Sequence, residues 1–452
     1  MATAATSNTS NDPSKATHLV VLIHGFWGNP GHLKHLRDTL AEAHEDSGLY
    51  ILTPKSNSDN NTYDGIEVGA ERITNEIEQV ITELREAGAK LSKISLAGYS
   101  LGGLLARYVV GLLYSNGTFN DLRPVNFTTF ATPHLGVRTP KPGYRVQIWN
   151  YLGSKTLSTS GQQIFLVDNF RGTGKQLLSI MAEPRSIFMR GLAMFENRSI
   201  YGNTLNDRSV PYYTSLITAT DPYVDPDAVD VHPLPDQDYP VILDPTDPVE
   251  PKARKADGEL TWHERYIFSQ RTRESLPFYA ILITVLPLAV PLFMLNAGYQ
   301  TYQSAQRVRL HESGSLIDLK RYRIPLLEKS QALQDEVMER IASERTRLAE
   351  ESGYVYLPTP PPEPASSSES KDANKSGEVA NKTSNSPWPT LALTPEQFEM
   401  IKNLDAEVKF TKYPCHIQKV RHTHAAIVVR TQKESFAEGR AVSSHWVKNF
   451  KV

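Results

Sequence analysis

A serine lies between two glycines in the run Gly98-Tyr99-Ser100-Leu101-Gly102. The residues at 93–97 predict a short buried strand before it, and those at 103–113 predict a helix after it. A serine at a sharp turn from strand to helix is a nucleophile elbow, in which the hydroxyl can attack a carbonyl carbon. Glycine on either side suits that turn, because side chains there would crowd a strained backbone. We therefore expect Ser100 to be a nucleophile.

Two backbone N–H groups are expected to stabilise the negative charge that develops when such a serine attacks. One belongs to Leu101, the residue directly after the serine. The other is expected from the loop HGFWG at 24–28, which follows a predicted apolar strand at 18–23. Such a loop supplies the second donor of an oxyanion hole, here the N–H of Phe26. We expect His24 to be a structural residue of this turn.

A serine hydroxyl becomes nucleophilic when an imidazole accepts its proton and a carboxylate orients that imidazole. Along an α/β-hydrolase chain the order is serine, acid, histidine. Asp207 follows a strand-like segment in an Asn-Asp turn and is the preferred acid. His24 and His134 precede it and break the order, and we expect His134 to line the pocket or pack beneath a cap. His422 and His424 both follow it, and His424 is preferred because it lies nearer the next predicted strand.

Strands and helices alternate from about residue 18 to residue 136, which is typical of a parallel sheet with helices on both faces. Short apolar helices at 137–197 suit a cap over the site. The rest of the core is predicted as strands at 199–201, 408–410 and 427–429 and helices that start near 394 and span 435–450. The fold class is therefore an α/β-hydrolase with a mostly parallel sheet, a cap insertion, and a membrane-associating apolar segment inserted before the last strand and helix.

That apolar segment, LPFYAILITVLPLAVPLFML at 276–295, lies in a stretch without charged residues between Glu274 and Arg307. As a helix, this segment would be long enough to cross a bilayer core of about 30 Å. A buried core helix is the alternative, but basic residues flank both ends and favour membrane contact. A simple span would place Ser100 and His424 on opposite sides of the membrane. We therefore expect a re-entrant hairpin or an interfacial helix.

Composition argues against several other classes of protein, among them nucleic-acid-binding and disulfide-bonded proteins. The chain has 48 Lys and Arg against 50 Asp and Glu, and a net charge of −2 gives no electrostatic case for nucleic-acid binding. A single cysteine, Cys415, excludes an internal disulfide and fits the reducing cytosolic side of the cell. The segment 221–250 is rich in Asp and Pro but lacks the spacing of a calcium-binding loop. We expect a solvated linker there, and no metal or cofactor.

These predictions divide the chain into consecutive segments. They are a disordered tail (1–17), the N-terminal part of the hydrolase core with the elbow (18–136), the cap (137–197), the core with the acid loop (198–220), a linker (221–275), the membrane hairpin or interfacial helix (276–298), a helical segment (299–356), a disordered linker (357–390) and the C-terminal part of the core with the histidine (391–452).

Five motifs resemble the serine esterase family of α/β-hydrolases, which includes fungal lipid-droplet phospholipases and monoacylglycerol lipases. They are HGFWGN at 24–29, GYSLGG at 98–103, ATPHLG at 131–136, NDRSVPYYT at 206–214 and HTHAAIVVR at 422–430. The resemblance covers about 18–215 and 394–450. It implies Ser100 as nucleophile, Asp207 as acid and His424 as base.

The expected function is a serine hydrolase that cleaves carboxylic esters of membrane or lipid-droplet lipids through an acyl-enzyme. Its substrate would be a glycerolipid or phospholipid, and its place the cytosolic face of a lipid droplet or of the endoplasmic reticulum membrane. Two alternatives stay open. One is a membrane-tethered scaffold that keeps the fold without the chemistry, and the other is a hydrolase of small soluble esters.

Overall fold

The computed structural model describes residues 12–138, 150, 153–252, 291–292, 294–314, 317–319, 322–323, 388 and 390–452. Most of the predicted tail, most of the apolar segment 276–295, the whole of the predicted helical segment beyond residue 323, and nearly all of the predicted disordered linker at 357–390 lie outside these residues.

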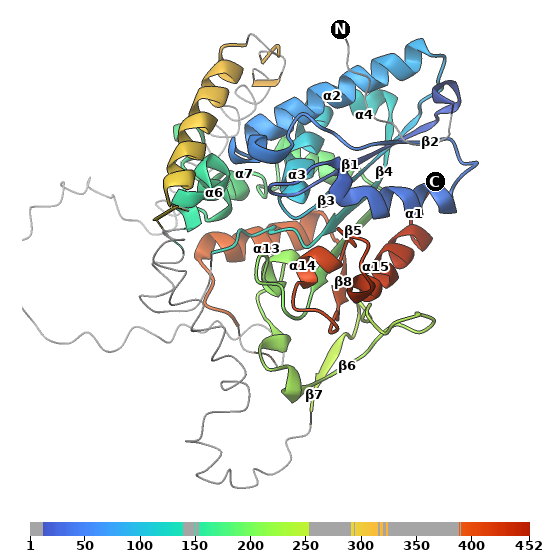
Figure 1. The fold of residues 1–452 in the computed structure, drawn as a ribbon, viewed down its shortest axis with the longest axis vertical. Helices are drawn as coiled ribbons and strands as arrows, with labels where there is room; N and C mark the ends of the chain where they lie inside the picture. The colour runs from blue at the N-terminus through green and yellow to red at the C-terminus, as the bar shows by residue number, and fades with distance from the viewer. Residues whose placement is uncertain are drawn as a thin grey trace, which may run out of the picture.

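Within the described residues, six strands form one parallel sheet, shown in Figure 1. The strand order is β2-β1-β3-β4-β5-β8. The strands are Leu49–Leu52 (β2), His18–Ile23 (β1), Lys93–Tyr99 (β3), Arg123–Phe130 (β4), Asn197–Asn203 (β5) and Thr411–Cys415 (β8). The central strands β1, β3 and β4 are buried along nearly their whole length because helices cover both of their faces. The predicted α/β-hydrolase fold with a parallel sheet is confirmed.

Helices pack on both faces of this sheet. On one face lie α2 (Ile66–Glu86), α3 (Leu101–Ser115), α8 (Ile187–Ala193) and α13 (Pro395–Glu407), and on the other lie α1 (Lys34–Ala43) and α15 (Ala437–Lys448). Successive residues of β1 point to opposite faces, so Leu19 joins the first cluster and Val20 the second. Two separate apolar cores result, one on each side of the sheet.

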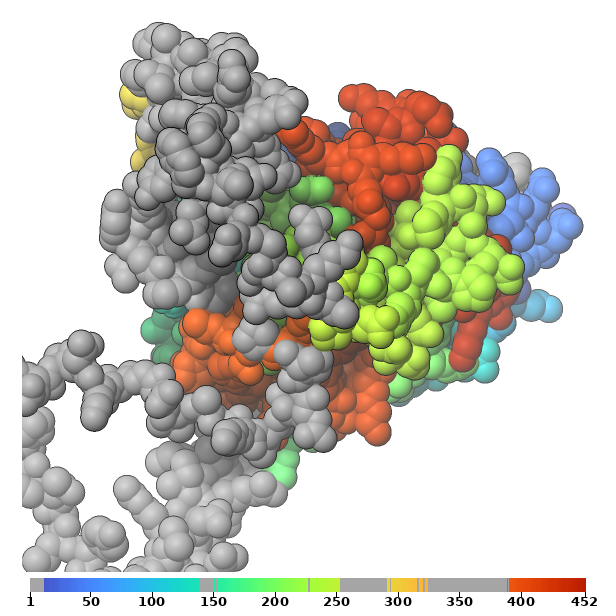
Figure 2. Space-filling view, turned by 90° about the horizontal axis from the view of Figure 1, so that it is seen from below, coloured from blue at the N-terminus to red at the C-terminus, as the bar shows by residue number. Residues whose placement is uncertain are grey.

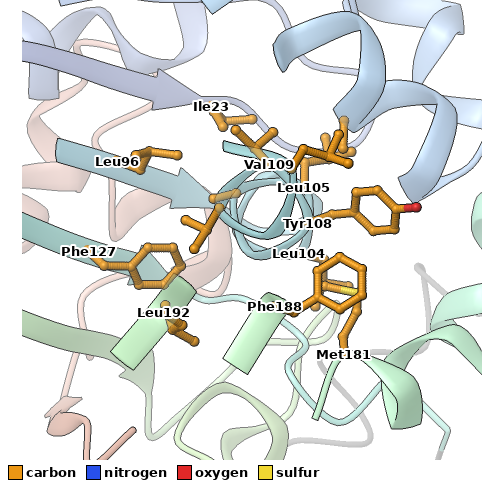
Figure 3. Close-up of a cluster of buried hydrophobic side chains, with 14 of the residues drawn as sticks. Ile23, Leu96, Leu104, Leu105, Tyr108, Val109, Phe127, Met181, Phe188 and Leu192 are labelled. Atoms are coloured by element: carbon orange, nitrogen blue, oxygen red, sulfur yellow. The ribbon is translucent and has the colours of Figure 1, made fainter. Parts of the chain in front are cut away.

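Helix α3 is buried from Leu101 to Leu113, because the sheet covers one side and α2 and α8 cover the other. Figure 3 shows its side chains between Phe127 of β4 and Phe188 of α8. A helix enclosed in this way is apolar on nearly every side, and its one charged side chain, the buried Arg107, donates to the carbonyls of His134 and Met181. The helix that follows Ser100 is therefore held rigidly.

Short helices connect the larger elements. They are η1 (Pro13–Lys15), η2 (Pro30–Leu33), η3 (Asp59–Tyr63), α4 (Thr118–Asp121), α6 (Ser158–Ile164), η4 (Phe170–Gly172), α7 (Leu177–Ile180), α9 (Tyr212–Ser215), η5 (Pro222–Val224), η6 (Pro226–Ala228), α14 (Thr423–Ala426) and η7 (Glu434–Phe436). Helices α7 and α8 fall in the predicted cap, yet Leu177 and Phe188 are buried in the core beside α3. Only part of 137–197 can therefore form a cap.

The segment 221–252 differs from the solvated linker that we predicted. Its short run at 241–243 is fully buried, and there the backbone N–H of His416 donates to Val241 (2.7 Å) while that of Leu243 donates to Pro414 (2.9 Å). Two short strands, β6 (Val229–Val231) and β7 (Val249–Pro251), pair antiparallel. Figure 2 shows the segment in yellow-green against the red C-terminal part. The many Asp and Pro residues concealed one apolar run that covers the edge strand β8.

The last strand also lies elsewhere than predicted. β8 is at Thr411–Cys415, just after the predicted 408–410. The predicted strand at 427–429 is wrong, because these buried residues follow α14 in a tight turn, with Val429 at a φ of 48°. A short apolar run does not by itself distinguish a strand from a buried turn or helix end. The helix predicted near 394 is confirmed as α13, and the last helix as α15.

Residues 294–312 are helical and lie beside α2, in gold in Figure 1. Ala297, Ser304 and His311 recur every seven residues and are buried, so one face of this helix packs on the core. Leu295 and Tyr299 lie on the opposite face and are 71% and 59% exposed. Over the ranges that the structure describes, no helix is both long and apolar enough to span a membrane, and 276–290 is not among them.

Candidate active site

The turn between β3 and α3 places Ser100 alone at its apex. Ser100 has a φ of 57° and a ψ of −128°, a conformation that L-residues rarely adopt. Its backbone N–H donates to the carbonyl of Phe130 (2.9 Å) on the next strand. A Cβ atom at position 102 would lie 2.1 Å from the carbonyl oxygen of Ile23, so only glycine fits there. The predicted elbow is present, and its neighbours hold the strained serine in place.

The structure brings together the three side chains predicted for the site. The Oγ of Ser100 lies 3.0 Å from Nε2 of His424, and Nδ1 of the same imidazole lies 2.9 Å from Oδ2 of Asp207. Both distances are within hydrogen-bond reach. In the tautomer that satisfies both contacts, Nδ1–H donates to the carboxylate and Nε2 accepts from the serine hydroxyl. The loop after β5 supplies the acid and α14 supplies the histidine.

The carboxylate of Asp207 is held by several donors and its side chain is only 2% exposed. Its Oδ1 accepts from the backbone N–H groups of Ser209 (3.0 Å) and Val210 (2.8 Å). Its Oδ2 accepts from the amide of Asn203 (2.8 Å) as well as from the imidazole. These bonds leave the carboxylate one orientation, which faces His424. Sequence reasoning did not single out Asn203, although its place at the end of β5, four residues before the acid, was visible.

Hydrogen bonds from side-chain hydroxyls to backbone carbonyls hold α14, the helix that carries His424. The hydroxyl of Tyr99 donates to the carbonyl of His424 (2.8 Å), and the hydroxyl of Thr423 donates to the carbonyl of Leu205 (2.8 Å). Burial raises the pKa of Tyr99 well above its usual range, so this phenol keeps its proton and acts as a donor. His422 is exposed at the start of α14. Of the two candidate histidines, the structure places His424 against the serine.

The two histidines that precede Asp207 in the chain, His24 and His134, are buried away from the hydrogen-bonded line of the site. His24 is buried, with Nε2 3.2 Å from the hydroxyl of Ser58, and burial lowers its pKa. His134 is fully buried with Nε2 2.9 Å from the hydroxyl of Thr129, and burial lowers its pKa well below the usual range. Both imidazoles are therefore neutral at pH 7. His24 is a structural residue, as predicted, and His134 packs in the interior.

The loop after β1 passes directly against the nucleophile. A Cβ atom at Gly25 would lie 2.7 Å from Cβ of Ser100, so the backbone itself makes this approach. The next peptide carries the N–H of Phe26. On the other side, Leu101 is the first residue of α3, where backbone N–H groups have no acceptor within the helix. Both predicted oxyanion donors thus belong to segments that border Ser100.

The arrangement has the parts needed for acyl transfer: a serine at an elbow, a histidine within reach of its hydroxyl, and a buried carboxylate behind that histidine. Within the parts of the chain that the structure describes, no group of three or more His, Cys, Asp or Glu side chains is placed to hold a metal ion.

Comparisons with known proteins bear on the N-terminal half of the chain. Residues 13–220 match the family described as "Putative serine esterase (DUF676)". The chain is 32% identical over 215 residues to "Putative lipase YDL109C" of Saccharomyces cerevisiae, covering 46% of this chain and 32% of that protein. It is 30% identical over 210 residues to "Putative lipase C4A8.10" of Schizosaccharomyces pombe, covering 45% and 26%. The resemblance to serine esterases is thereby confirmed for these residues.

The chain spans about a quarter to a third of the length of these two relatives. Among solved structures, an "Alpha/beta hydrolase fold protein from Nakamurella multipartita" is 11% identical, with 45% of this chain and 80% of that chain covered and a TM-score of 0.24. The family match contains Ser100 and Asp207 but ends before His424. The histidine is placed at the site by the three-dimensional fold.

Proposed function

We propose that this chain is a carboxylic ester hydrolase in which Ser100 is the nucleophile, His424 the general base and Asp207 the residue that orients the base. The observation that carries the proposal is the continuous line of hydrogen bonds from Asp207 through His424 to Ser100. The family description and the name "lipase" carried by two relatives support the same class of reaction.

The proposed reaction proceeds through an acyl-enzyme. Oγ of Ser100 attacks the ester carbonyl while Nε2 of His424 takes its proton, and the backbone N–H groups of Phe26 and Leu101 stabilise the oxyanion. The imidazolium then gives its proton to the leaving alcohol as the C–O bond breaks. Water attacks the acyl group with His424 again as the base, and a carboxylic acid is released.

The natural substrate in this proposal is a long-chain glycerolipid or phospholipid met at a membrane or droplet surface. Support comes from the helix 294–312, whose outer face exposes Leu295 (71%), Tyr299 (59%) and Tyr302 (61%). An exposed apolar face of this kind is typical of contact with a membrane or a partner. The face continues the apolar sequence 276–295, which makes a lipid surface the proposed occupant.

The geometry of the chain supports a re-entrant or interfacial arrangement. Residues up to 252 pack on the same folded body as the helix 294–312, which is joined to the core through Ser304 and His311. A segment between them that enters lipid must therefore leave on the side where it entered. The proposed location is the cytosolic face of a lipid droplet or of the endoplasmic reticulum.

A substrate panel tests the function. The purified full chain is assayed with a lysophospholipid, a diacyl phospholipid and a monoacylglycerol in mixed micelles, and with p-nitrophenyl acetate in solution. We expect fatty-acid release from at least one long-chain lipid, with a higher kcat/KM than for the acetate. Hydrolysis of the acetate alone would support the small-ester alternative. No hydrolysis of any ester would contradict the proposal and favour the scaffold.

Glutamate at positions 295 and 299 tests the lipid surface. We expect Leu295→Glu/Tyr299→Glu to lower the partition of the protein onto phospholipid vesicles or artificial droplets at least tenfold, because each change removes apolar area, worth roughly 1–2 kcal/mol, and adds a charge. Flotation measures this partition. Val224→Glu is the matched control, since Val224 is equally exposed but lies on η5. Equal flotation of both variants and the wild type would refute the proposed lipid-binding face.

A further inference from the structure

The loop 25–28, which carries the proposed oxyanion donor Phe26, is held from outside the catalytic machinery. We call it the oxyanion loop. Trp27 follows Phe26 directly and has a φ of 51°, an unusual value for a residue with a large side chain. Its backbone N–H donates to the hydroxyl of Thr62 (3.2 Å), and its indole N–H donates to the hydroxyl of Tyr63 (2.8 Å). Both acceptors belong to η3.

Two further contacts join the oxyanion loop to η3. The backbone N–H of Asp59 donates to the carbonyl of Gly28 (2.8 Å), at the end of the loop. The ring of Phe26 packs edge-on against the ring of Tyr63, with centroids 5.1 Å apart. Four contacts from one short helix therefore determine the conformation of a loop that borders Ser100. The chemistry of the triad does not by itself require any of them.

Helix η3 is fixed in turn by Asp64, which is fully buried and follows it directly. Its carboxylate accepts from the hydroxyl of Ser304 (2.7 Å), from Nε (3.0 Å) and Nη2 (2.8 Å) of Arg307, and from Nη1 of Arg72 (2.8 Å). Nη2 of Arg307 also donates to the carbonyl of Asn60 within η3 (2.8 Å). Charge-assisted bonds to a buried carboxylate are strong, and loss of a partner is costly.

We propose that η3 positions the oxyanion loop, and that the helix 294–312 positions η3 through Asp64. Thr62, Tyr63 and Arg307 are then positioning residues for the N–H of Phe26. An oxyanion donor acts only when it lies about 3 Å from the developing charge, so a small displacement lowers kcat more than it changes KM. The inference rests on the proposed function. It links the helix that continues the apolar segment to the site of charge stabilisation through the hydrogen bonds of Arg307, Thr62 and Tyr63.

Three substitutions weaken this connection at three different points: Thr62→Val, Tyr63→Phe and Arg307→Gln. With the soluble ester p-nitrophenyl butyrate, we expect each to lower kcat by about tenfold, which is less than the loss of a whole oxyanion donor, with KM little changed. The affinity for a trifluoromethyl ketone, whose tetrahedral adduct bears an oxyanion, should fall by the same factor. Rates are normalised to active sites counted by a fluorophosphonate, so unfolded protein does not contribute.

A matched control comes from the same helix. Arg309→Gln removes an exposed arginine two residues from Arg307 and should keep the wild-type kcat. The double variant Trp27→Phe/Tyr63→Phe should have a kcat no lower than that of the poorer single variant, because both substitutions remove the same hydrogen bond between these two side chains. If Arg307→Gln does not fold, Ser304→Ala tests the same connection.

The outcomes separate the two proposals. Unchanged kcat per active site and unchanged ketone affinity in all three variants would overturn the positioning role, even if their melting temperatures fall. A wild-type protein that neither hydrolyses the ester nor reacts with the fluorophosphonate would overturn the proposed function instead.

Discussion

Ester hydrolysis by Ser100→Ala is expected to be at least about four orders of magnitude slower than hydrolysis by the wild type. Alanine leaves the site without a nucleophile, and the remaining groups cannot form an acyl-enzyme. The fold should persist, because the side chain of Ser100 makes one hydrogen bond, to His424, and its removal opens no space larger than an oxygen atom. Initial rates on a lysophospholipid or monoacylglycerol measure the effect.

A fluorophosphonate probe gives an independent measurement of the same change. It should label the wild type on one residue and leave Ser100→Ala unlabelled, while circular dichroism shows equal folding of both proteins. Labelling that persists in the variant would mean that another residue is the nucleophile. Hydrolysis that persists without labelling would mean that water is activated directly, and the acyl-enzyme would be excluded.

Asp207→Asn is expected to lower kcat by about four orders of magnitude. The asparagine amide can donate to Nδ1 of His424, which places the ring proton on Nε2 and leaves the serine hydroxyl without an acceptor. In the other orientation of the asparagine, its NH2 group faces the backbone N–H groups of Ser209 and Val210, which donate to Oδ1 in the wild type. Measured kcat at neutral pH tests this expectation.

The triad should act as a unit, so Asp207→Asn/His424→Ala should be scarcely slower than His424→Ala alone. His422→Ala is the matched control, since this neighbouring histidine is exposed and lies outside the hydrogen-bonded line. If His422→Ala loses activity while His424→Ala keeps it, the base is His422 and our assignment of His424 is wrong.

The elbow could be predicted from sequence because its signal is local. A strand, a serine between glycines and a helix occupy consecutive residues, and the tight turn allows few other residue types. The order of serine, acid and histidine then narrowed the candidates to Asp207 and two histidines. His424 was preferred to His422 for its place beside a predicted strand at 427–429, which is absent. What brings His424 to the serine is the orientation of α14, which depends on Tyr99 and Thr423.

Contacts between distant segments were outside the reach of pattern reasoning. Tyr99 serves the site through a hydrogen bond to the carbonyl of His424, a partner that its spacing in the sequence did not indicate. The buried run at 241–243 was hidden among Asp and Pro residues, whose composition predicts a solvated linker. The apolar run at 427–429 was mistaken for a strand because its burial comes from tertiary packing. In each case a tertiary neighbour decided the outcome.

The pairing of β5 with β8 has a consequence for biosynthesis. β5 ends at Asn203 and its neighbour begins at Thr411, so the edge of the sheet stays open while some two hundred intervening residues are translated. The serine and the histidine are likewise 324 positions apart. Contacts so distant in sequence form slowly, and an open strand edge favours aggregation. The nascent chain must therefore remain catalytically inert until α14, which follows β8 and carries His424, has emerged from the ribosome.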